Sequence, residues 1–574
     1  MHAATTDASW DHETDVLVLG SGAAGLASAV VAAQEGFDCL VLEKTEYVGG
    51  TTAYSAGTCW IPDNPFQRAE GIDDDGIAAR EYLDTLVGDR APRELREAYL
   101  QHGPEMVTYM SRLGVRFWQS TTVVDYHPEI PGASSGGRAL EPQPFDGRKL
   151  GKDHFRRVRP PVPEFALFGG SLMIRRAEVD QLLGVYRGSA RSVALALKLG
   201  VRWALDRTRY PRGTRLTMGN ALVANLYHQL TARRGAVWFN AATTELLTDR
   251  TGAVIGAVVA HQGRELRVRA RRAVVLAGGG FPADPELRRR YLPHPVAQFT
   301  RAGEGSTGDT MRLAQSIGAA VGPSCDDNAL WFPSSIGRRR DGTTVVFPHI
   351  WDRAKPGLVA VNSAGRRFVD ESVSYHRFTR AMYDSEKSVP SIPTWLIVDS
   401  RYLAKYGLGM IYPHLPKALL TRHIKSGYLH SRNTIRELAI TIGVDPGGLE
   451  QAVADNNAFS TTGVDAAFHK GESLFGKQYG DPQHSPNPNL GPIDNPPYYA
   501  LAVVPTPLGT AIGLRTDTEA RVVDTSGKPI VGLYACGNDA TSVMGAEYPG
   551  AGCQVGAGMT FGYIATRHAA ARNP

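Results

Sequence analysis

The strongest constraint on the fold is a glycine-rich turn that separates two apolar runs near the start of the chain. The first run, Val16 to Leu19, is typical of a buried strand in a parallel sheet. It is followed by Gly20-Ser21-Gly22-Ala23-Ala24-Gly25, by helix-forming residues up to Gln34, and by a second apolar run, Cys39 to Leu42, that stops at Glu43. Strand, turn, helix, strand and acid in this order are the fingerprint of a dinucleotide-binding unit.

The fingerprint predicts where a nucleotide would bind. Gly20 permits the tight turn, Gly22 lets the backbone approach a pyrophosphate, and Gly25 lets the helix pack closely on the strand. The free N–H groups and positive dipole end of the helix favour phosphate there. Glu43 is placed to accept hydrogen bonds from ribose hydroxyls.

Two further segments favour FAD over a nicotinamide cofactor. The small residues from Gly49 to Ser55 are suited to lie along a pyrophosphate, a ribityl chain and a ring. Near the other end of the chain, a strand ending at Ala535 runs into Cys536-Gly537-Asn538, and a new helix opens at Gly552. A cofactor held from both ends of the chain is expected to stay bound, as a flavin does. No His occurs in 49–58, which excludes a His-linked flavin there and predicts non-covalent FAD.

Composition narrows the class of protein. The chain has 574 residues and a net charge of +5, which gives little support to nucleic-acid binding. No run approaches the roughly 18 apolar residues of a membrane span, and the acidic N-terminal stretch lacks a signal core. Five scattered cysteines without a CxxC motif predict reduced thiols and a cytoplasmic location, with Cys536 and Cys553 as packing residues. No metal site is predicted.

A segment in the first third of the chain stands apart from this pattern. A helix is predicted from Ser189 to Leu205, within an extra segment at 165–210, and a basic run from Arg148 to Arg159 precedes it. One interpretation is a solvated loop and a packed helix. The other is a lid, an oligomer contact or a membrane-surface patch formed by 148–210.

Several longer motifs identify a family. The chain resembles the flavoprotein family of fumarate reductases and 3-ketosteroid dehydrogenases, and most of all the 3-ketosteroid Δ1-dehydrogenases. The resemblance rests on Gly49-Gly-Thr-Thr-Ala-Tyr-Ser, Leu330-Trp-Phe, the run from Val361 to Tyr375, and the stretch from Leu514 to Gly552. It implies an α/β fold in which a Rossmann-like FAD-binding domain is interrupted by an α+β catalytic domain. The expected boundaries are 1–328 and 498–574 for the FAD-binding domain and 329–497 for the catalytic domain.

The resemblance also implies a reaction and its residues. Forming a double bond beside a ring ketone requires a clamp for the carbonyl oxygen, a base for the alpha proton, and flavin N5 as the acceptor of the beta hydride. By the resemblance, the Tyr548 hydroxyl and the Gly552 N–H hold the carbonyl, Tyr375 is the base, and Tyr126 assists it. A tyrosine base would need its pKa lowered from about 10. The implied partners are a cyclic ketone or steroid substrate and an external electron acceptor.

The complete set of predicted cofactor residues comes from the fingerprint, the flanking segments and the resemblance together. It consists of Gly20, Gly22, Ala23, Ala24, Gly25, Glu43, Lys44, Gly49, Gly50, Thr51, Thr52, Ser55, Ala277, Gly278, Gly279, Asp309, Gly537, Asn538 and Val555.

Other functions stay open at this stage. Where steroid ring dehydrogenases of the family commonly have a lysine before the last flavin segment, this chain reads Thr506-Pro-Leu-Gly-Thr-Ala-Ile-Gly513. The alternatives are therefore a dehydrogenase of smaller, cyclohexanone-type ketones, a fumarate reductase-type enzyme that would use arginines such as Arg366 and Arg367, or a flavin-binding protein without catalysis. Phe332, Trp331 and Tyr54 are candidates for the wall of an apolar pocket.

Overall fold

The computed structural model describes residues 9–572, except 73, 75, 184–188 and 326. Residues 1–8 of the stretch predicted to lack a signal core, and residues 184–188 of the predicted extra segment, lie outside the described residues.

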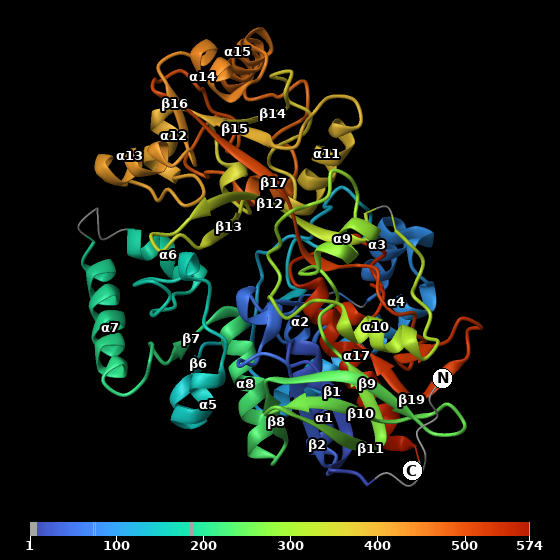
Figure 1. Ribbon diagram of the computed structural model, residues 1–574. Helices are drawn as coiled ribbons and strands as arrows, with labels where there is room; N and C mark the ends of the chain where they lie inside the picture. The colour runs from blue at the N-terminus through green and yellow to red at the C-terminus, as the bar shows by residue number, and fades with distance from the viewer. Residues whose placement is uncertain (1–8, 73, 75, 184–188, 326, 573–574) are drawn as a thin grey trace.

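A largely parallel sheet forms the lower half of the molecule in Figure 1, in the order β18-β19-β11-β1-β2-β8. Its strands are β1 (His12–Leu19), β2 (Cys39–Glu43), β8 (Ala236–Phe239), β11 (Arg264–Leu276), β18 (Arg521–Val523) and β19 (Pro529–Ala535). Strand β1 pairs in parallel with β2 and β11, as a Rossmann-like fold requires. Strands β9 (Ala241–Thr248) and β10 (Val254–His261) extend β11 as antiparallel neighbours. The predicted fold class is confirmed.

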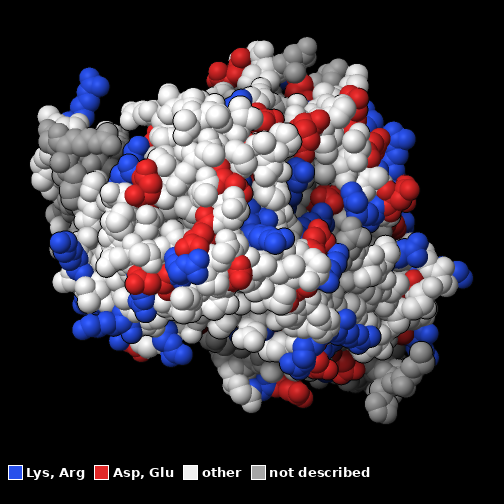
Figure 2. Space-filling view, turned by 90° about the horizontal axis from the view of Figure 1, so that it is seen from above, with Lys and Arg blue, Asp and Glu red and all other residues white. Residues whose placement is uncertain are grey.

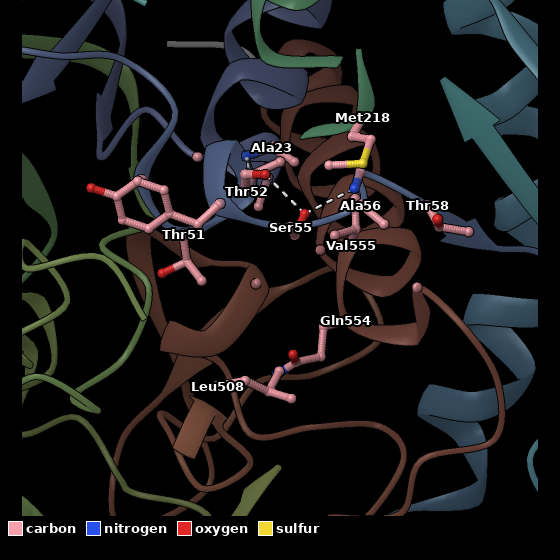
Figure 3. A pocket seen from close by; sticks show the side chains of 18 of the residues that line it. Ala23, Thr51, Thr52, Ser55, Ala56, Thr58, Met218, Leu508, Gln554 and Val555 are labelled. Atoms are coloured by element: carbon pink, nitrogen blue, oxygen red, sulfur yellow. Dashed lines mark hydrogen bonds between the residues drawn. The ribbon is translucent and has the colours of Figure 1, made fainter. Parts of the chain in front are cut away.

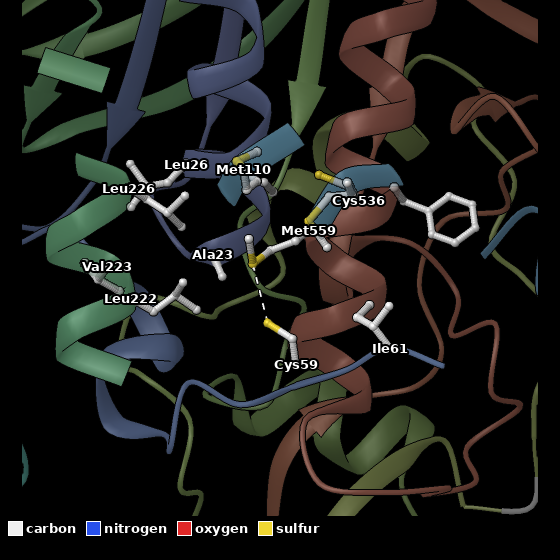
Figure 4. Close-up of a cluster of buried hydrophobic side chains, with 14 of the residues drawn as sticks. Ala23, Leu26, Cys59, Ile61, Met110, Leu222, Val223, Leu226, Cys536 and Met559 are labelled. Atoms are coloured by element: carbon white, nitrogen blue, oxygen red, sulfur yellow. Dashed lines mark hydrogen bonds between the residues drawn. The ribbon is translucent and has the colours of Figure 1, made fainter. Parts of the chain in front are cut away.

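Three helices pack against one another beside this sheet and build the main core (Figure 4). They are α1 (Ala23–Gln34), α8 (Met218–Ala232) and α17 (Cys553–Ala571). The thiol of Cys59 lies 3.8 Å from the sulfur of Met559 within this core, and Cys536 is buried there too. Burial raises the pKa of both thiols to about 12. All five cysteines are free, and the four buried ones, Cys39, Cys59, Cys536 and Cys553, act as packing residues.

A second, mainly antiparallel sheet forms the upper half of Figure 1. It contains β12 (Ala329–Arg338), β13 (Thr344–Pro348), β14 (Leu358–Val361), β15 (Thr394–Val398), β16 (His430–Arg432) and β17 (Tyr498–Thr510). The helix α11 (Tyr375–Glu386) packs against β12. The long strand β17 pairs with β12 and β15, so this sheet extends past residue 497, where the sequence places the return to the FAD-binding domain. The domain boundaries themselves stay a prediction.

Shorter elements surround the two sheets. The remaining helices are α2 (Pro65–Ala69), α3 (Ile77–Val87), α4 (Arg93–Arg112), α5 (Gly151–Arg157), α6 (Arg176–Leu183), α7 (Ala190–Arg207), α9 (Pro285–Tyr291), α10 (Asp309–Ser316), α12 (Ser400–Tyr406), α13 (Lys417–Lys425), α14 (Ile435–Ile442), α15 (Pro446–Thr462) and α16 (Leu474–Tyr479). Small sheets are formed by β3 (Cys59–Trp60), β4 (Phe117–Gln119) and β5 (Ala139–Pro142), and by β6 (Phe145–Asp146) with β7 (Arg215–Leu216).

The predicted helix at 189–205 is present as α7, at the left edge of Figure 1. The hydroxyl of Ser189 accepts a hydrogen bond from the backbone N–H of Ser192 and so caps the first turn. Four large apolar residues of α7, spaced four apart, are exposed to solvent: Val193 (40%), Leu197 (63%), Val201 (59%) and Leu205 (66%). Helix α7 therefore carries an apolar row on its outer face.

Elsewhere on the surface, charged side chains of both signs are present. On the face in Figure 2, basic and acidic side chains are interspersed, in keeping with the small net charge. Among the described helices, none is long and apolar enough to cross a membrane. The described residues also contain no group of three or more His, Cys, Asp or Glu side chains arranged to hold a metal ion.

Candidate active site

One large cavity, of about 1470 Å³, runs between the two sheets. Single-ligand pockets are about 300–1,000 Å³, so this cavity has room for a dinucleotide and a second molecule. Its wall includes the glycine turn after β1 at one end and Tyr375, at the start of α11, at another.

The first helix is built to receive an anion. No side chain caps the N-terminus of α1, and only the Ala23 N–H is taken, by the hydroxyl of Thr52 at 3.0 Å. Gly25 shows why the turn needs glycine, because a Cβ there would lie 2.0 Å from the carbonyl oxygen of Gly20. The open helix end and its dipole suit the pyrophosphate of FAD.

Charged groups mark the ribose end of the cavity. The carboxylate of Glu43 accepts hydrogen bonds from Ser21 and from both the backbone N–H (2.9 Å) and hydroxyl (2.7 Å) of Thr45. The Lys44 ammonium lies 2.7 Å from the carboxylate of Asp309, which joins the end of β2 to the start of α10. Burial acts to raise the pKa of Asp309, but Lys44 outweighs it and lowers that pKa. The carboxylate of Glu43 is thus held by Ser21 and Thr45 next to the Lys44–Asp309 ion pair.

Figure 3 shows the middle of the cavity. Thr51, Thr52 and Ser55 lie along one side, while Leu508 and Gln554 face them across the open space. The hydroxyl of Ser55 donates a hydrogen bond to the carbonyl of Thr52 at 2.8 Å and accepts one from the N–H of Gly57 at 2.9 Å. These two bonds fix the conformation of residues 52–57, which form this part of the wall. Segments far apart in the sequence thus enclose one elongated space, as the sequence predicts for a cofactor held from both ends.

Most of the predicted cofactor residues meet at this cavity. Those on its wall are Gly20, Gly22, Ala23, Ala24, Glu43, Lys44, Gly50, Thr51, Thr52, Ser55, Ala277, Gly278, Gly279, Asp309, Gly537, Asn538 and Val555. Gly25 and Gly49 lie behind the wall, where they allow close packing: a Cβ on Gly49 would lie 2.9 Å from the side chain of Val223. The residues present therefore fit FAD.

The three predicted catalytic tyrosines form one cluster on the wall of the cavity. The hydroxyls of Tyr126 and Tyr375 are 3.0 Å apart. The ring of Tyr548 stacks on Tyr126 at 5.2 Å and meets Tyr375 edge-on at 5.3 Å, measured between ring centroids. Phe332 closes one side, 4.5 Å from the Tyr375 ring. The structure thus brings together residues that are more than 400 positions apart.

Burial controls the acidity of these hydroxyls. It raises the pKa values of Tyr126, Tyr375 and Tyr548 above the ordinary value of about 10, and the neighbouring Tyr126 raises that of Tyr375 further. The lowered pKa expected of a tyrosine base is therefore wrong for Tyr375 in this structure. The physical reason is that burial disfavours the charged phenolate, and the neighbouring hydroxyls of Tyr126 and Tyr548 raise the pKa further.

The turn from Tyr548 to Gly552 is held firmly from behind. The carbonyl oxygen of Pro549 accepts hydrogen bonds from the Tyr82 hydroxyl (2.7 Å) and from the backbone N–H of Tyr126 (2.9 Å). Gly552 has φ +94°, and a Cβ there would lie 2.2 Å from the carbonyl oxygen of Thr58. Within the described part of the chain, no acceptor takes the Gly552 N–H. This N–H, on the cavity wall beside Tyr548, is available to bind a carbonyl oxygen.

A buried ion-pair network supports the same turn. Arg380 of α11 contacts the carboxylates of Asp327 at 2.8 Å and Glu547 at 2.6 Å, and donates to the carbonyl of Ala546 at 2.8 Å. Since Glu547 directly precedes Tyr548, this network links the helix that begins with Tyr375 to the turn that carries the predicted carbonyl clamp.

The remaining residues that the sequence analysis named lie partly on the cavity wall and partly away from it. Phe332 and Tyr54 line the cavity, whereas Trp331 is buried outside it and donates its indole N–H to Asp327. Arg366 and Arg367 are not on the cavity wall, and Arg367 is paired with Glu371 and Asp465.

Sequence reasoning missed several wall residues that no motif marks. They include Trp118, Gln119, Arg175, Arg301, Gln478 and Gln554. They come from loops and element ends whose approach to the cavity depends on tertiary packing, so no local pattern could have found them.

Comparison with known proteins agrees with this geometry. A family model described as an FAD binding domain matches residues 15–555. The chain is 37% identical to a 3-oxosteroid 1-dehydrogenase of Mycobacterium tuberculosis, over 97% of this chain and 98% of that protein. It is also 37% identical to a 4-oxocyclohex-2-ene-1-carboxylate 5-dehydrogenase of Sinomonas cyclohexanicum, over 97% and 93%.

A solved structure matches nearly the whole fold. The crystal structure of 3-ketosteroid Δ1-dehydrogenase from Sterolibacterium denitrificans, in complex with 1,4-androstadiene-3,17-dione, superposes with a TM-score of 0.89 at 36% identity. The match covers 98% of this chain and all of that one.

Proposed function

The chain belongs to the FAD-binding fumarate reductase and succinate dehydrogenase flavoprotein family as a 3-ketosteroid Δ1-dehydrogenase-like oxidoreductase, and on this basis we propose that it desaturates the 1,2 bond of a 3-ketosteroid. The observation that carries the proposal is the meeting of Tyr126, Tyr375, Tyr548 and the free Gly552 N–H on one cavity wall. These groups are what abstraction of a proton beside a carbonyl requires.

Each group has a separate task in the proposed reaction. The Tyr548 hydroxyl and the Gly552 N–H hold the ketone oxygen and stabilise the negative charge that develops on it. Tyr375 accepts the alpha proton as a phenolate and becomes a neutral phenol, and the Tyr126 hydroxyl, 3.0 Å away, donates a hydrogen bond to the Tyr375 oxygen before the transfer. Because burial raises the pKa of Tyr375, few molecules hold it as phenolate at neutral pH, but each such phenolate is a strong base.

FAD, held by the residues along the rest of the cavity, supplies the acceptor for the beta hydride when it is bound. We propose that it binds non-covalently, because the described residues that line the cavity include neither His nor Cys.

A second substrate class is favoured by one observation. The relative from Sinomonas cyclohexanicum, whose name states a cyclohexenone carboxylate, is as similar to this chain as the steroid enzyme of Mycobacterium tuberculosis. A dehydrogenase of small oxo-carboxylates would use the same four groups.

Anaerobic mixing with candidate ketones tests the reaction directly. We expect 3-ketosteroids to bleach the flavin absorbance of the purified holoenzyme, and turnover to resume with an artificial electron acceptor. Bleaching by small cyclic ketones alone would favour the second class. No bleaching by any cyclic ketone would refute the dehydrogenase function.

We also propose a membrane-surface contact for the segment 148–210, in a protein located in the cytoplasm. The supporting observation is the exposed row Val193, Leu197, Val201 and Leu205 on α7, with exposed basic residues on the preceding α5. Sedimentation with anionic vesicles should carry the wild type down and leave Leu197→Gln in solution. Concentration-dependent self-association lost in the same variant would instead favour an oligomer contact.

A further inference from the structure

One arginine on the cavity wall has no partner of its own. Arg301 lines the cavity and is half-buried there. Within the described residues, no carboxylate lies within ion-pair distance of its guanidinium, and none of its side-chain N–H groups has an acceptor. Glu164, the acid that acts on it most strongly, is already bound to Arg339 through two hydrogen bonds of 2.7 and 2.8 Å.

Three other basic side chains on the same wall each have a close contact. Lys44 pairs with Asp309, and Arg159 pairs with Glu304. Arg175 rests on the face of Trp118, with 3.9 Å between its guanidinium carbon and the ring centroid. Among the described residues, the ring that the Arg301 guanidinium faces is that of Phe165, whose centroid lies 5.7 Å from the guanidinium carbon.

Burial lowers the pKa of Arg301 to about 10, so the side chain still carries its charge at neutral pH. A partly desolvated cation without a hydrogen-bond acceptor is unfavourable, and an acidic group on a ligand would remove this cost. A guanidinium presents its donors as a planar fork that matches two oxygens of a carboxylate.

The backbone places Arg301 near the substrate end of the cavity. Its N–H donates to the carbonyl of Pro507 at 3.0 Å, and Pro507 is paired with Trp331 across β17 and β12. The next residue on β12, Phe332, contacts the ring of Tyr375. The cavity wall also contains the apolar side chains of Phe332, Pro348 and Ile350.

We propose that Arg301 binds a carboxylate on the ketone substrate, so that the enzyme prefers ring ketones that also carry an acid group. The inference rests on the proposed dehydrogenase function and adds to it the charge of the substrate. The apolar wall would contact the hydrocarbon frame, while Tyr548 and Gly552 hold the ketone and Arg301 fixes the acid. The wall also contains Glu70 and Glu141, so a general positive field is not the source of the preference.

Matched acid and ester substrates test this proposal. The pairs are 4-oxocyclohexanecarboxylate with its methyl ester, and 3-oxochol-4-en-24-oic acid with its methyl ester. The holoenzyme, Arg301→Gln, Arg301→Lys and Arg175→Gln are compared by kcat/KM and by FAD content. Wild type should prefer the acid of at least one pair, and Arg301→Gln should lose about 10- to 100-fold on that acid only. Arg301→Lys should lose less, because it keeps the charge without the fork, and Arg175→Gln should affect acid and ester alike.

Several results would overturn the assignment. It is refuted if wild type turns over acid and ester equally, if Arg301→Gln slows both equally, or if the selective loss occurs in Arg175→Gln. Loss of bound FAD in Arg301→Gln would make the arginine a cofactor residue. If Arg301→Gln does not fold, the acid preference of wild type and its decrease in Arg301→Lys decide the matter. Failure of the dehydrogenase function itself is distinct, since wild type would then turn over none of the four ketones.

Discussion

Replacement of Tyr375 by Phe is the most direct test of the proposed mechanism. The change removes one hydroxyl from the buried cluster and leaves the ring in place between Tyr126, Tyr548 and Phe332. The Tyr126 hydroxyl loses its partner at 3.0 Å, which should cost about 1–3 kcal/mol of stability. Loss of a general base should lower kcat by about 10²- to 10⁴-fold, so the two effects are separable.

The assay is reduction of an artificial acceptor with a 3-ketosteroid, followed against pH. Since the phenolate is the active form and burial raises the pKa of Tyr375, wild-type kcat should rise with pH throughout the neutral range. The Tyr375→Phe enzyme should retain its FAD, bind substrate, and show a flat, low pH profile.

Tyr227→Phe is the matched control. Tyr227 is buried on α8, outside the cavity, and its hydroxyl hydrogen-bonds to His154 at 2.7 Å. It should lose comparable stability and keep full activity. Wild-type turnover by Tyr375→Phe, or an unchanged pH slope in that variant, would refute Tyr375 as the base.

Three further changes probe the clamp, its support and a buried acid. Gly552→Ala places a Cβ 2.2 Å from the carbonyl of Thr58 at φ +94°, so kcat/KM should fall at least about 100-fold, and an unchanged value would remove Gly552 from the clamp. Arg380→Gln leaves the buried carboxylate of Asp327 without an ion-pair partner and leaves Glu547 with Arg90 alone, so it should cost about 3–5 kcal/mol in denaturant unfolding, while unchanged unfolding would show that the network is dispensable. Burial acts to raise the pKa of Glu371, but Arg367 and a buried lysine bring it down to about 2, so its stabilising contribution is complete above pH 4.5 and lost as pH falls toward 2. Glu371→Gln should therefore flatten the acid limb of a stability–pH curve, and an unaltered limb would contradict this reasoning.

The cofactor end of the site was predictable because its signals are local. Strand β1, helix α1 and strand β2 follow one another within 32 residues, and the apolar runs and the glycines specify them directly. The spacing also identified Glu43, because an acid at the end of the second strand can only face the same edge of the sheet as the glycine turn.

The predicted catalytic residues could not be identified from local sequence patterns. Twenty-two tyrosines occur in the chain, and no periodicity separates Tyr126, Tyr375 and Tyr548 from the others. Only resemblance to a family selected them, and tertiary packing brings them together. The expected pKa of Tyr375 was wrong because burial, which the sequence does not report, dominates its acidity. Arg301 was missed for the same reason, since its lack of an acidic neighbour is a property of the packed structure.

The cofactor cradle and the carbonyl clamp share one mechanical support. Gly552 is the residue before α17, and α17 packs against α1, whose N-terminus is the predicted pyrophosphate site. The contact is close: the Ser28 hydroxyl on α1 donates to the carbonyl of Gly562 on α17 at 3.2 Å, and a Cβ on Gly562 would lie 2.7 Å from the carbonyl of Ala24. A shift of α17 would therefore move Gly552 relative to the N-terminus of α1, and we expect this helix packing to help set the distance between ketone and hydride acceptor in the proposed reaction.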